Sequence, residues 1–253
     1  MPGLLSQVMR VRILPEAPKN FKSINMVMKI GFYGHSYCAF KSEESFLNIF
    51  AKKINAEILN TGVRQGSEER ILYELKKTKN LDLAIIFHSY PSYLFLPGSD
   101  RDFDLKGVIN RHAENIWQSF EIEKISSGWD YHLENHKQFI DKFKNLENFV
   151  IALNNYKEYF YDPDLQLNRF YGSLIQIDQY LKNKNLLSIH IVEKNYLPNW
   201  FKFTSGIEDN SILDIITDNK LSENDEWCAN GITPIGNKKV ADRLYEIYAA
   251  CSR

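Results

Sequence analysis

Three short apolar runs alternate with two amphipathic stretches in the first third of the chain, and this order limits the folds that are open to it. The runs cover residues 29–34, 56–63 and 81–87, and their length and content of Ile, Leu, Val and Phe are typical of buried strands. Between them, residues 45–54 and 68–79 carry apolar side chains at helical spacing. Strands and helices in this order, with short connections, predict a parallel sheet with right-handed crossovers.

The rest of the chain continues this alternation after an interruption. Residues 91–147 contain chain-breaking prolines and a polar stretch, so we expect an insertion over the carboxyl edge of the sheet. The further elements that the periodicity predicts are a helix over 132–143, strands at 149–153 and 186–192, a helix over 165–181, a loop region over 193–229 and a last helix capped by Asn237. The expected fold is a three-layer α/β/α sandwich with a five-stranded parallel sheet in the flavodoxin-like order. In that order strand one lies between strands two and three, and we expect it to be the central strand.

The chain of 253 residues is long enough for one large domain or two small ones. We expect a single domain over residues 26–253, because no linker, repeat or low-complexity tract divides it. Residues 1–25 lack a sustained apolar period and make a poor signal peptide, so they are predicted to be a loosely packed leader.

Charge and cysteine content exclude several classes of function. Lys and Arg number 31 against 32 Asp and Glu, so no global field favours nucleic acid or an anionic membrane. No apolar run approaches the roughly 20 residues that a membrane span requires. The three cysteines show no paired spacing, which favours a reducing, cytoplasmic compartment over a disulfide framework.

Three residues at predicted loops could carry chemistry together. Ser36 follows the first strand, Gly66 opens the helix after the second, and His88 follows the third. The carboxyl ends of parallel strands meet at one edge of a sheet, so these positions are expected to be neighbours. Ser36 is a candidate nucleophile, although serine is also common in turns. The backbone N–H of Gly66 could stabilise an oxyanion, and Gly66 could equally be a tight-turn glycine.

Other polar residues give weaker alternatives. His35 adjoins Ser36, but neighbours at such a turn usually point apart. His132 and His136 stand at i and i+4 and could share a metal, yet a solvated helix face is the simpler interpretation. Cys38 has no obvious activating neighbour. Nothing resembles a phosphate loop or a dinucleotide fingerprint, so no cofactor is expected.

Several motifs resemble those of one hydrolase family. Gly34-His35-Ser36, then Asn60-Thr61-Gly62-Val63 with Gly66, then Asn230-Gly231-Ile232-Thr233-Pro234-Ile235-Gly236 are similar, in this order, to the first, second and last blocks of the SGNH/GDSL hydrolases. The chain is most similar to a branch of that family found in phages and marine bacteria, and the resemblance covers residues 28–90 and 225–250.

The chain also departs from the family pattern at the positions that matter most for catalysis. His35 stands where the family has Asp, Gly231 where it has the catalytic His, and Cys228 where it has the partner Asp of that His. The third block, which supplies an oxyanion-binding Asn in the family, is replaced by His88-Ser89-Tyr90. His88 is the best substitute base, because it is expected at the end of the strand beside Ser36. His88 and His35 could equally be hydrogen-bonded loop histidines.

The resemblance implies an esterase or acyl hydrolase, acting on an acylated small molecule or glycan. Ser36 would attack the ester, and the Ser36 and Gly66 amides would hold the oxyanion. The rival hypothesis is a catalytically degenerate relative that binds a glycan or a protein partner, since a serine without a base is a weak nucleophile.

Overall fold

A computed structural model describes residues 27–34, 36–39, 42–62, 66–91, 93–94, 103–104, 155, 159, 162–220 and 231–251 of the chain. Its strands are β1 (Met28–Gly34), β2 (Ala56–Asn60), β3 (Leu83–Phe87), β4 (Tyr93–Leu94), β5 (Phe103–Asp104), β6 (Leu187–Ile191) and β7 (Ile207–Glu208). Its helices are α1 (Phe46–Lys53), α2 (Glu68–Lys77), α6 (Pro163–Asn183), α7 (Ser211–Asp218) and α8 (Pro234–Cys251), with 3-10 turns η1 (Ser36–Cys38) and η4 (Lys194–Tyr196).

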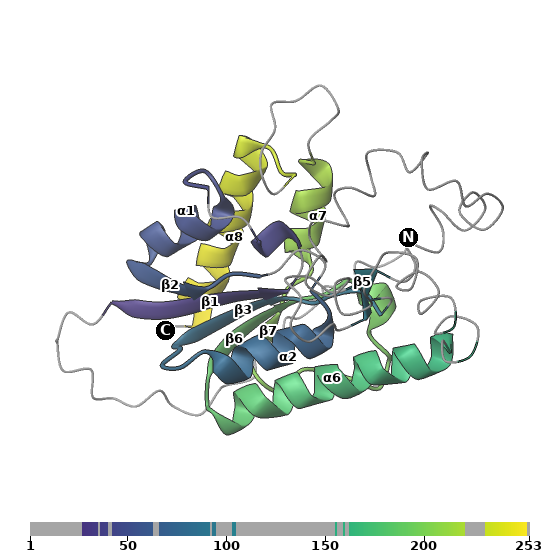
Figure 1. Cartoon of the computed structure of the whole chain (residues 1–253). Helices are drawn as coiled ribbons and strands as arrows, with labels where there is room; N and C mark the ends of the chain where they lie inside the picture. The colour runs from purple at the N-terminus through teal and green to yellow at the C-terminus, as the bar shows by residue number, and fades with distance from the viewer. Residues whose placement is uncertain are drawn as a thin grey trace, which may run out of the picture.

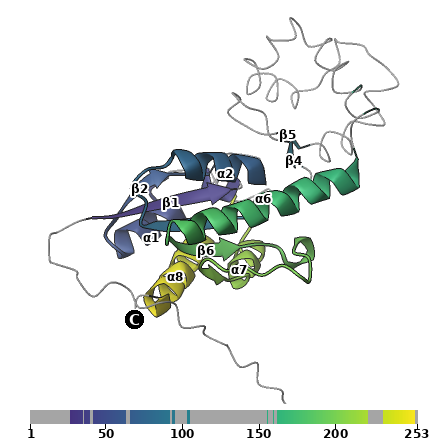
Figure 2. The same cartoon turned by 90° about the horizontal axis from the view of Figure 1, so that it is seen from below.

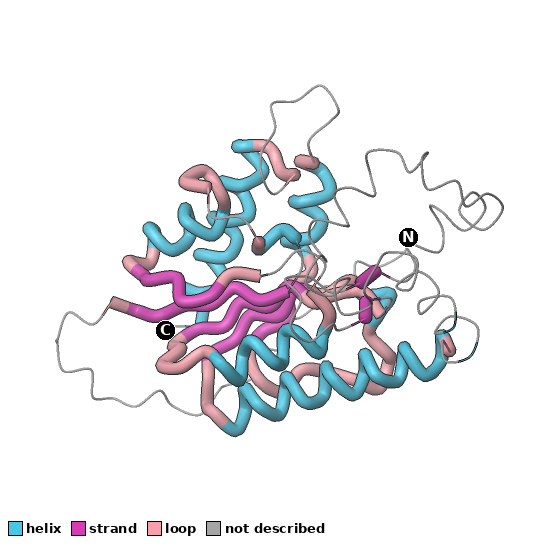
Figure 3. The backbone as a smooth tube through the Cα atoms, in the orientation of Figure 1, coloured by secondary structure: helices cyan, strands magenta, loops and turns pink. Residues whose placement is uncertain are grey.

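The main sheet has five strands in the order β2-β1-β3-β6-β7, and all of its pairings are parallel. The expected α/β fold with a five-stranded parallel sheet is therefore confirmed. Strand β1 lies between β2 and β3 as predicted, but it is not the central strand, because β6 and β7 follow β3 on the other side and leave β3 in the middle. Figure 3 shows the strands of this sheet running side by side.

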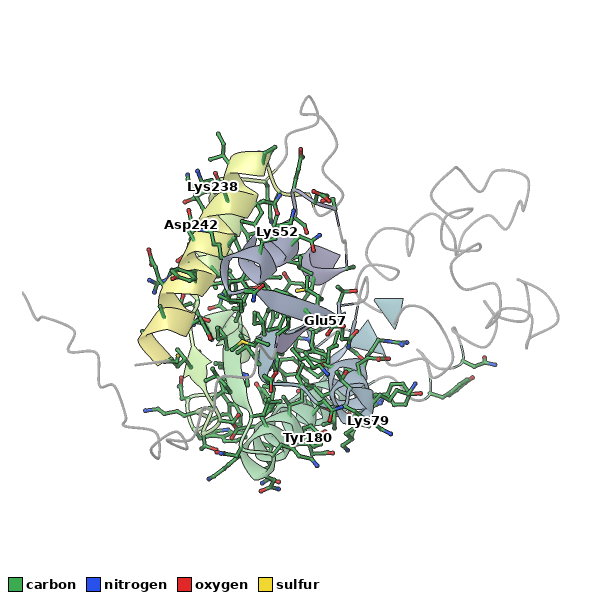
Figure 4. All side chains as sticks on the ribbon, turned by 90° about the vertical axis from the view of Figure 1, so that its left-hand side faces the viewer. Lys52, Glu57, Lys79, Tyr180, Lys238 and Asp242 are labelled. Carbon is green, nitrogen blue, oxygen red and sulfur yellow. The ribbon has the colours of Figure 1, made fainter. Side chains whose placement is uncertain are left out.

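Helices cover both faces of the sheet, which makes three layers. Helices α1, α7 and α8 lie above the strands in Figure 1, and α2 and α6 lie below them. Figure 4 gives a second view of the same layers: Lys238 and Asp242 mark α8 on one side, and Tyr180 marks α6 on the other. The long helix α6 runs beside α2 across its face, as Figure 2 shows from below.

The alternation of side chains along β3 builds a separate core on each face. Leu83, Ile85 and Phe87 pack with α1, α7 and α8, whereas Ala84 and Ile86 pack with α2 and α6. All five residues are buried, as expected for a parallel strand that is covered on both faces. His88 continues this alternation and therefore falls on the face of α2 and α6.

Two further predicted features were wrong, and both concern the last third of the sequence. The region 193–229 is not all loop, because it contains β7 and α7. Asn237 does not cap the last helix, which begins at Pro234; Thr233 accepts a hydrogen bond from the Gly236 N–H instead, with an N–O distance of 3.1 Å. The leader, the predicted strand at 149–153 and the predicted helix at 132–143 lie outside the described residues. Of the predicted insertion between the third and fourth strands, only Pro91 and the short strands β4 and β5 are described, and they form an antiparallel pair.

Candidate active site

The loops that carry Ser36 and His88 leave the sheet next to each other. Gly34 is the last residue of β1 and pairs with Phe87, the last residue of β3. The two backbones approach so closely that a Cβ on Gly34 would lie 1.8 Å from the Phe87 carbonyl oxygen, and the φ angle of Gly34 is +116°. Only glycine satisfies both conditions. The first residue of the predicted Gly-His-Ser motif is thus explained by the packing of the strand ends.

Ser36 opens the 3-10 turn η1 two residues after this glycine. Its backbone therefore lies at the carboxyl edge of the sheet, beside the start of the His88 loop. His35 and the Ser36 side chain lie outside the described part of the structure.

Gly66 stands two residues before helix α2, and it is buried. The Ser67 side chain caps the helix by accepting a hydrogen bond from the Arg70 N–H at 3.2 Å. Glu68 and Glu69 place two acids in the first turn, which favours the helix by complementing its dipole. A recess beside Gly66 and Tyr33 has room for about one water molecule. The role of the Gly66 amide as an oxyanion donor stays a prediction.

His88 is held by groups from two neighbouring elements. Its Nδ1 atom lies 3.1 Å from Oε2 of Glu68, the first residue of α2. Its Nε2 atom lies 2.9 Å from Nδ1 of His190, the fourth residue of β6. The second carboxylate oxygen of Glu68 accepts a hydrogen bond from the Ser89 N–H at 2.6 Å. Both ring nitrogens of His88 are therefore occupied.

His190 is fully buried and stacks against Phe203, with ring centroids 3.9 Å apart. Burial, with a smaller contribution from His88, lowers the pKa of His190 to about 3. His190 is therefore neutral at physiological pH, and its hydrogen bonds must be those of a neutral imidazole.

A set of hydrogen bonds continues from His190 to helix α6. The Nε2 atom of His190 lies 2.7 Å from the carbonyl oxygen of Ser205 and 3.1 Å from Oγ of Ser188. The Ser205 hydroxyl donates to Oδ1 of Asp178 at 2.6 Å, and the Thr204 hydroxyl donates to Oδ2 at 2.7 Å. Burial alone would raise the pKa of Asp178, but hydrogen bonds from Ser205 and Thr204 lower it below its usual value. We call Glu68, His88, His190, Ser205 and Asp178 the polar chain.

Several predicted site residues do not join this cluster. Gly231 is exposed, with a φ of +69°, and Cys228 lies outside the described residues. Burial raises the pKa of Cys38 well above its ordinary value, so this thiol is a poor nucleophile. His132 and His136 are not described. Within the ranges that the structure covers, no group of three or more His, Cys, Asp or Glu side chains could hold a metal ion.

The polar chain contains four residues that the sequence analysis did not single out: Glu68, Asp178, His190 and Ser205. One signal was available for His190. Ser188 and His190 occupy alternate positions of a strand that is otherwise Leu and Ile, so both point to the same buried face. Polar groups on such a face must be hydrogen-bonded to one another or to a neighbouring helix.

Comparison with known proteins adds no relative, because no family model, no curated protein and no solved structure matches the chain. The similarity to SGNH/GDSL hydrolases therefore depends on the short motifs alone. No helix among the described residues is long and apolar enough to cross a membrane.

Proposed function

We propose that the chain is a serine ester hydrolase that acts on an acylated small molecule or glycan. Ser36 is the nucleophile, the amides of Ser36 and Gly66 hold the oxyanion, and His88 is the base. Attack of the Ser36 hydroxyl on the ester carbonyl forms an acyl-enzyme and releases the alcohol, and water then releases the acid.

One observation carries this proposal: the backbones at Ser36 and His88 leave adjacent strand ends, and His88 has a buried carboxylate on Nδ1. The contact between Glu68 and Nδ1 of His88 is of the same kind as the contact between the acid and the histidine of a catalytic triad. Such a carboxylate fixes the orientation of the ring and stabilises the imidazolium that forms when the histidine takes the serine proton. The Glu68–His88 pair could thus replace the acid and histidine that the last sequence block lacks.

A second candidate function, ligand binding without catalysis, is favoured by the other nitrogen of His88. Because Nε2 faces His190 at 2.9 Å, the ring would have to exchange His190 for Ser36 before it could accept the serine proton. A relative that has lost its catalytic histidine would keep the loops of this edge for binding alone.

Activity against short-chain aryl esters separates the two candidates. We expect Ser36→Ala to reduce kcat/KM to the uncatalysed background, since general-base assistance to a nucleophile contributes roughly 10²–10⁴-fold. Ser42→Ala is the matched control, because the Ser42 side chain is exposed and, among the described residues, hydrogen bonds reach only its carbonyl oxygen. His88→Ala should lose the same activity, and the double variant should be no worse than either single variant. A parent protein that hydrolyses no ester faster than Ser36→Ala would favour the binding function.

We also propose a cytoplasmic setting. Cys38 and Cys251 are both free thiols, as expected for a protein kept in a reducing compartment.

A further inference from the structure

The donors and acceptors of the polar chain determine where its protons lie, beginning at His190. The Ser205 carbonyl oxygen, 2.7 Å from Nε2 of His190, can only accept a hydrogen bond. The two neighbouring hydroxyls have already donated their protons: Ser188 to this same carbonyl at 2.6 Å, and Ser205 to Asp178 at 2.6 Å. Nothing nearby can therefore donate to Nε2, so the proton of His190 is on Nε2.

The protonation of His190 in turn determines that of His88. Because His190 is neutral and carries its proton on Nε2, its Nδ1 atom is a bare acceptor. The Nε2 atom of His88, 2.9 Å away, must then donate to it. A neutral His88 with its proton on Nε2 would leave its Nδ1 bare and facing Oε2 of Glu68 at 3.1 Å. Two acceptors would then face each other unless a further proton lies between them.

We propose that Glu68 and His190 position His88 through one shared proton between Glu68 and His88, and that this proton holds the loop 88–90 against helix α2 and strand β6. The proton is either on His88, which makes an ion pair with the Glu68 carboxylate, or on Glu68, which makes a neutral pair. Both forms satisfy every donor and acceptor from Glu68 to Asp178. Glu68 and His190 are positioning residues here, and the proposal does not require Ser36 to be a nucleophile. With its Nε2 protonated, His88 can act as the base of the proposed hydrolase only after it has lost a proton and exchanged His190 for Ser36.

Loss of the shared proton breaks this arrangement. With Glu68 ionised and His88 neutral, His88 donates from Nδ1 and leaves its Nε2 bare. Either two bare nitrogens then face each other at 2.9 Å, or His190 moves its proton to Nδ1 and leaves Nε2 bare against the Ser205 carbonyl at 2.7 Å. The contact is therefore present when the proton is bound and weakens as the pH rises.

Four elements besides β3 contribute titratable groups on the face of the sheet where His88 lies. Helix α2 contributes Glu68, strand β6 contributes His190, and helix α6 contributes Asp178, which acts through Ser205. On the same face of the sheet, β1 contributes Tyr33, and burial raises the pKa of this phenol to about 12, so it stays neutral over the range considered. Glu68 is thus the described anion in direct contact with the His88 ring.

Nitrogen chemical shifts of the histidine rings test the proposal directly. In the full-length 15N-labelled protein near neutral pH, we expect Nε2 to be protonated in both His88 and His190 and Nδ1 of His190 to be bare. Single substitutions His88→Gln and His190→Asn assign the signals. A bare Nε2 on His88, or a protonated Nδ1 on His190, would overturn the proposal whether or not the protein hydrolyses esters.

Substitution of Glu68 gives a second test, because glutamine supplies a permanent donor in place of the shared proton. In Glu68→Gln the amide nitrogen donates to Nδ1 of His88, and the amide oxygen still accepts from the Ser89 N–H. When the pH is raised from about 7 to about 10, the Ser89 amide of the parent should exchange with solvent at least roughly tenfold faster than that of Glu68→Gln at the same pH. Glu69→Gln, the matched control on the next residue of α2, should behave like the parent. Equal exchange in the parent and Glu68→Gln at both pH values would contradict the shared proton.

Discussion

At the scale of single residues, His190 is a histidine that the fold keeps uncharged. A histidine in an unfolded chain takes up a proton below a pH of about 6.5. In the folded protein the depressed pKa of about 3 prevents this until the medium is strongly acidic. Between these two values the unfolded state binds one more proton than the folded state at this residue. His190 therefore contributes stability that is complete above pH 6.5 and is lost as the pH falls toward 3.

The expected slope for one such proton is about 1.4 kcal/mol of unfolding free energy per pH unit. We predict that His190→Asn unfolds with a shallower dependence on pH between about 6.5 and 3, because Asn does not titrate. Urea unfolding at a series of pH values measures this. Ser188→Ala is the control: it removes a neighbouring hydrogen bond, so it should lower the stability at every pH and leave the slope unchanged. A His190→Asn variant with the slope of the parent would show that His190 becomes charged in the fold.

At the scale of secondary-structure elements, a single side chain of α8 joins the first helix to the last. Helix α1 begins after Ser45, whose side chain makes no capping hydrogen bond. Asn237 replaces that cap, since its Oδ1 atom accepts from the Phe46 N–H at 2.9 Å. The amide nitrogen of Asn237 donates to the Ile232 carbonyl at 3.1 Å. Asn237 is buried, so each of these groups would be costly to leave without a partner.

We predict that Asn237→Ala lowers the unfolding free energy by about 1–3 kcal/mol, because it leaves the Phe46 N–H and the Ile232 carbonyl without this partner. In a chain of this size that loss corresponds to a fall in Tm of several degrees, which thermal unfolding followed by circular dichroism would detect. Lys238→Ala is the matched control, because Lys238 is the next residue of α8 and is exposed (Figure 4). A Tm for Asn237→Ala as high as that of the control would mean that α1 does not depend on this cap.

At the scale of the whole molecule, one sheet separates two cores that are closed by different helices. Phe46 and Phe50 of α1 meet Val240 and Leu244 of α8 on one face. On the other face, Leu75 of α2 meets Ile177 and Leu181 of α6. Helices among the described residues thus cover both faces of the sheet.

Because helices already cover both faces of the sheet, we predict that the leader adds little to the stability of the protein. Deletion of residues 1–25 should leave the Tm of the protein within about 2 °C of the full chain, since a change of 1 kcal/mol moves the Tm by roughly 2–4 °C at this size. Differential scanning calorimetry of the two forms makes the comparison. A fall of several degrees in the shortened protein would show that the leader packs against the domain.

The parts of the fold that the sequence predicted are those with a long or strongly periodic pattern. Helix α6 follows an apolar stripe over Phe170, Leu174, Ile177 and Leu181, and all four are buried. The strand β7 has two residues, too few to show any period. Helix α7 was missed although Ile212 and Ile216 stand at i and i+4, because one helical turn of apolar residues in a polar region is a weak signal.

Only part of the candidate site was predicted, because the order of the strands places the loop residues but not the side chains that contact them. Ser36, Gly66 and His88 each follow a strand, so the topology alone brings their backbones to one edge. The partners of His88 could not be found in this way, because Glu68 looks like an ordinary acid in a first helical turn and His190 lies within a strand. Such contacts depend on the register between β3 and β6, which pairs Ile86 with His190. The sequence of either strand alone does not determine this register.

The hydrogen bond between Phe46 and Asn237 also determines when helix α1 can be completed during protein synthesis. It joins residues that are 191 positions apart, and a ribosome completes the first long before it reaches the second. Helix α1 has eight residues, too few to be stable by itself in water. During synthesis the apolar side chains of α1 that pack against α8 therefore lack this cover until residues 234–251 have been made. For most of that interval this surface is a target for chaperones, and a message truncated before α8 would yield a product that cannot bury it.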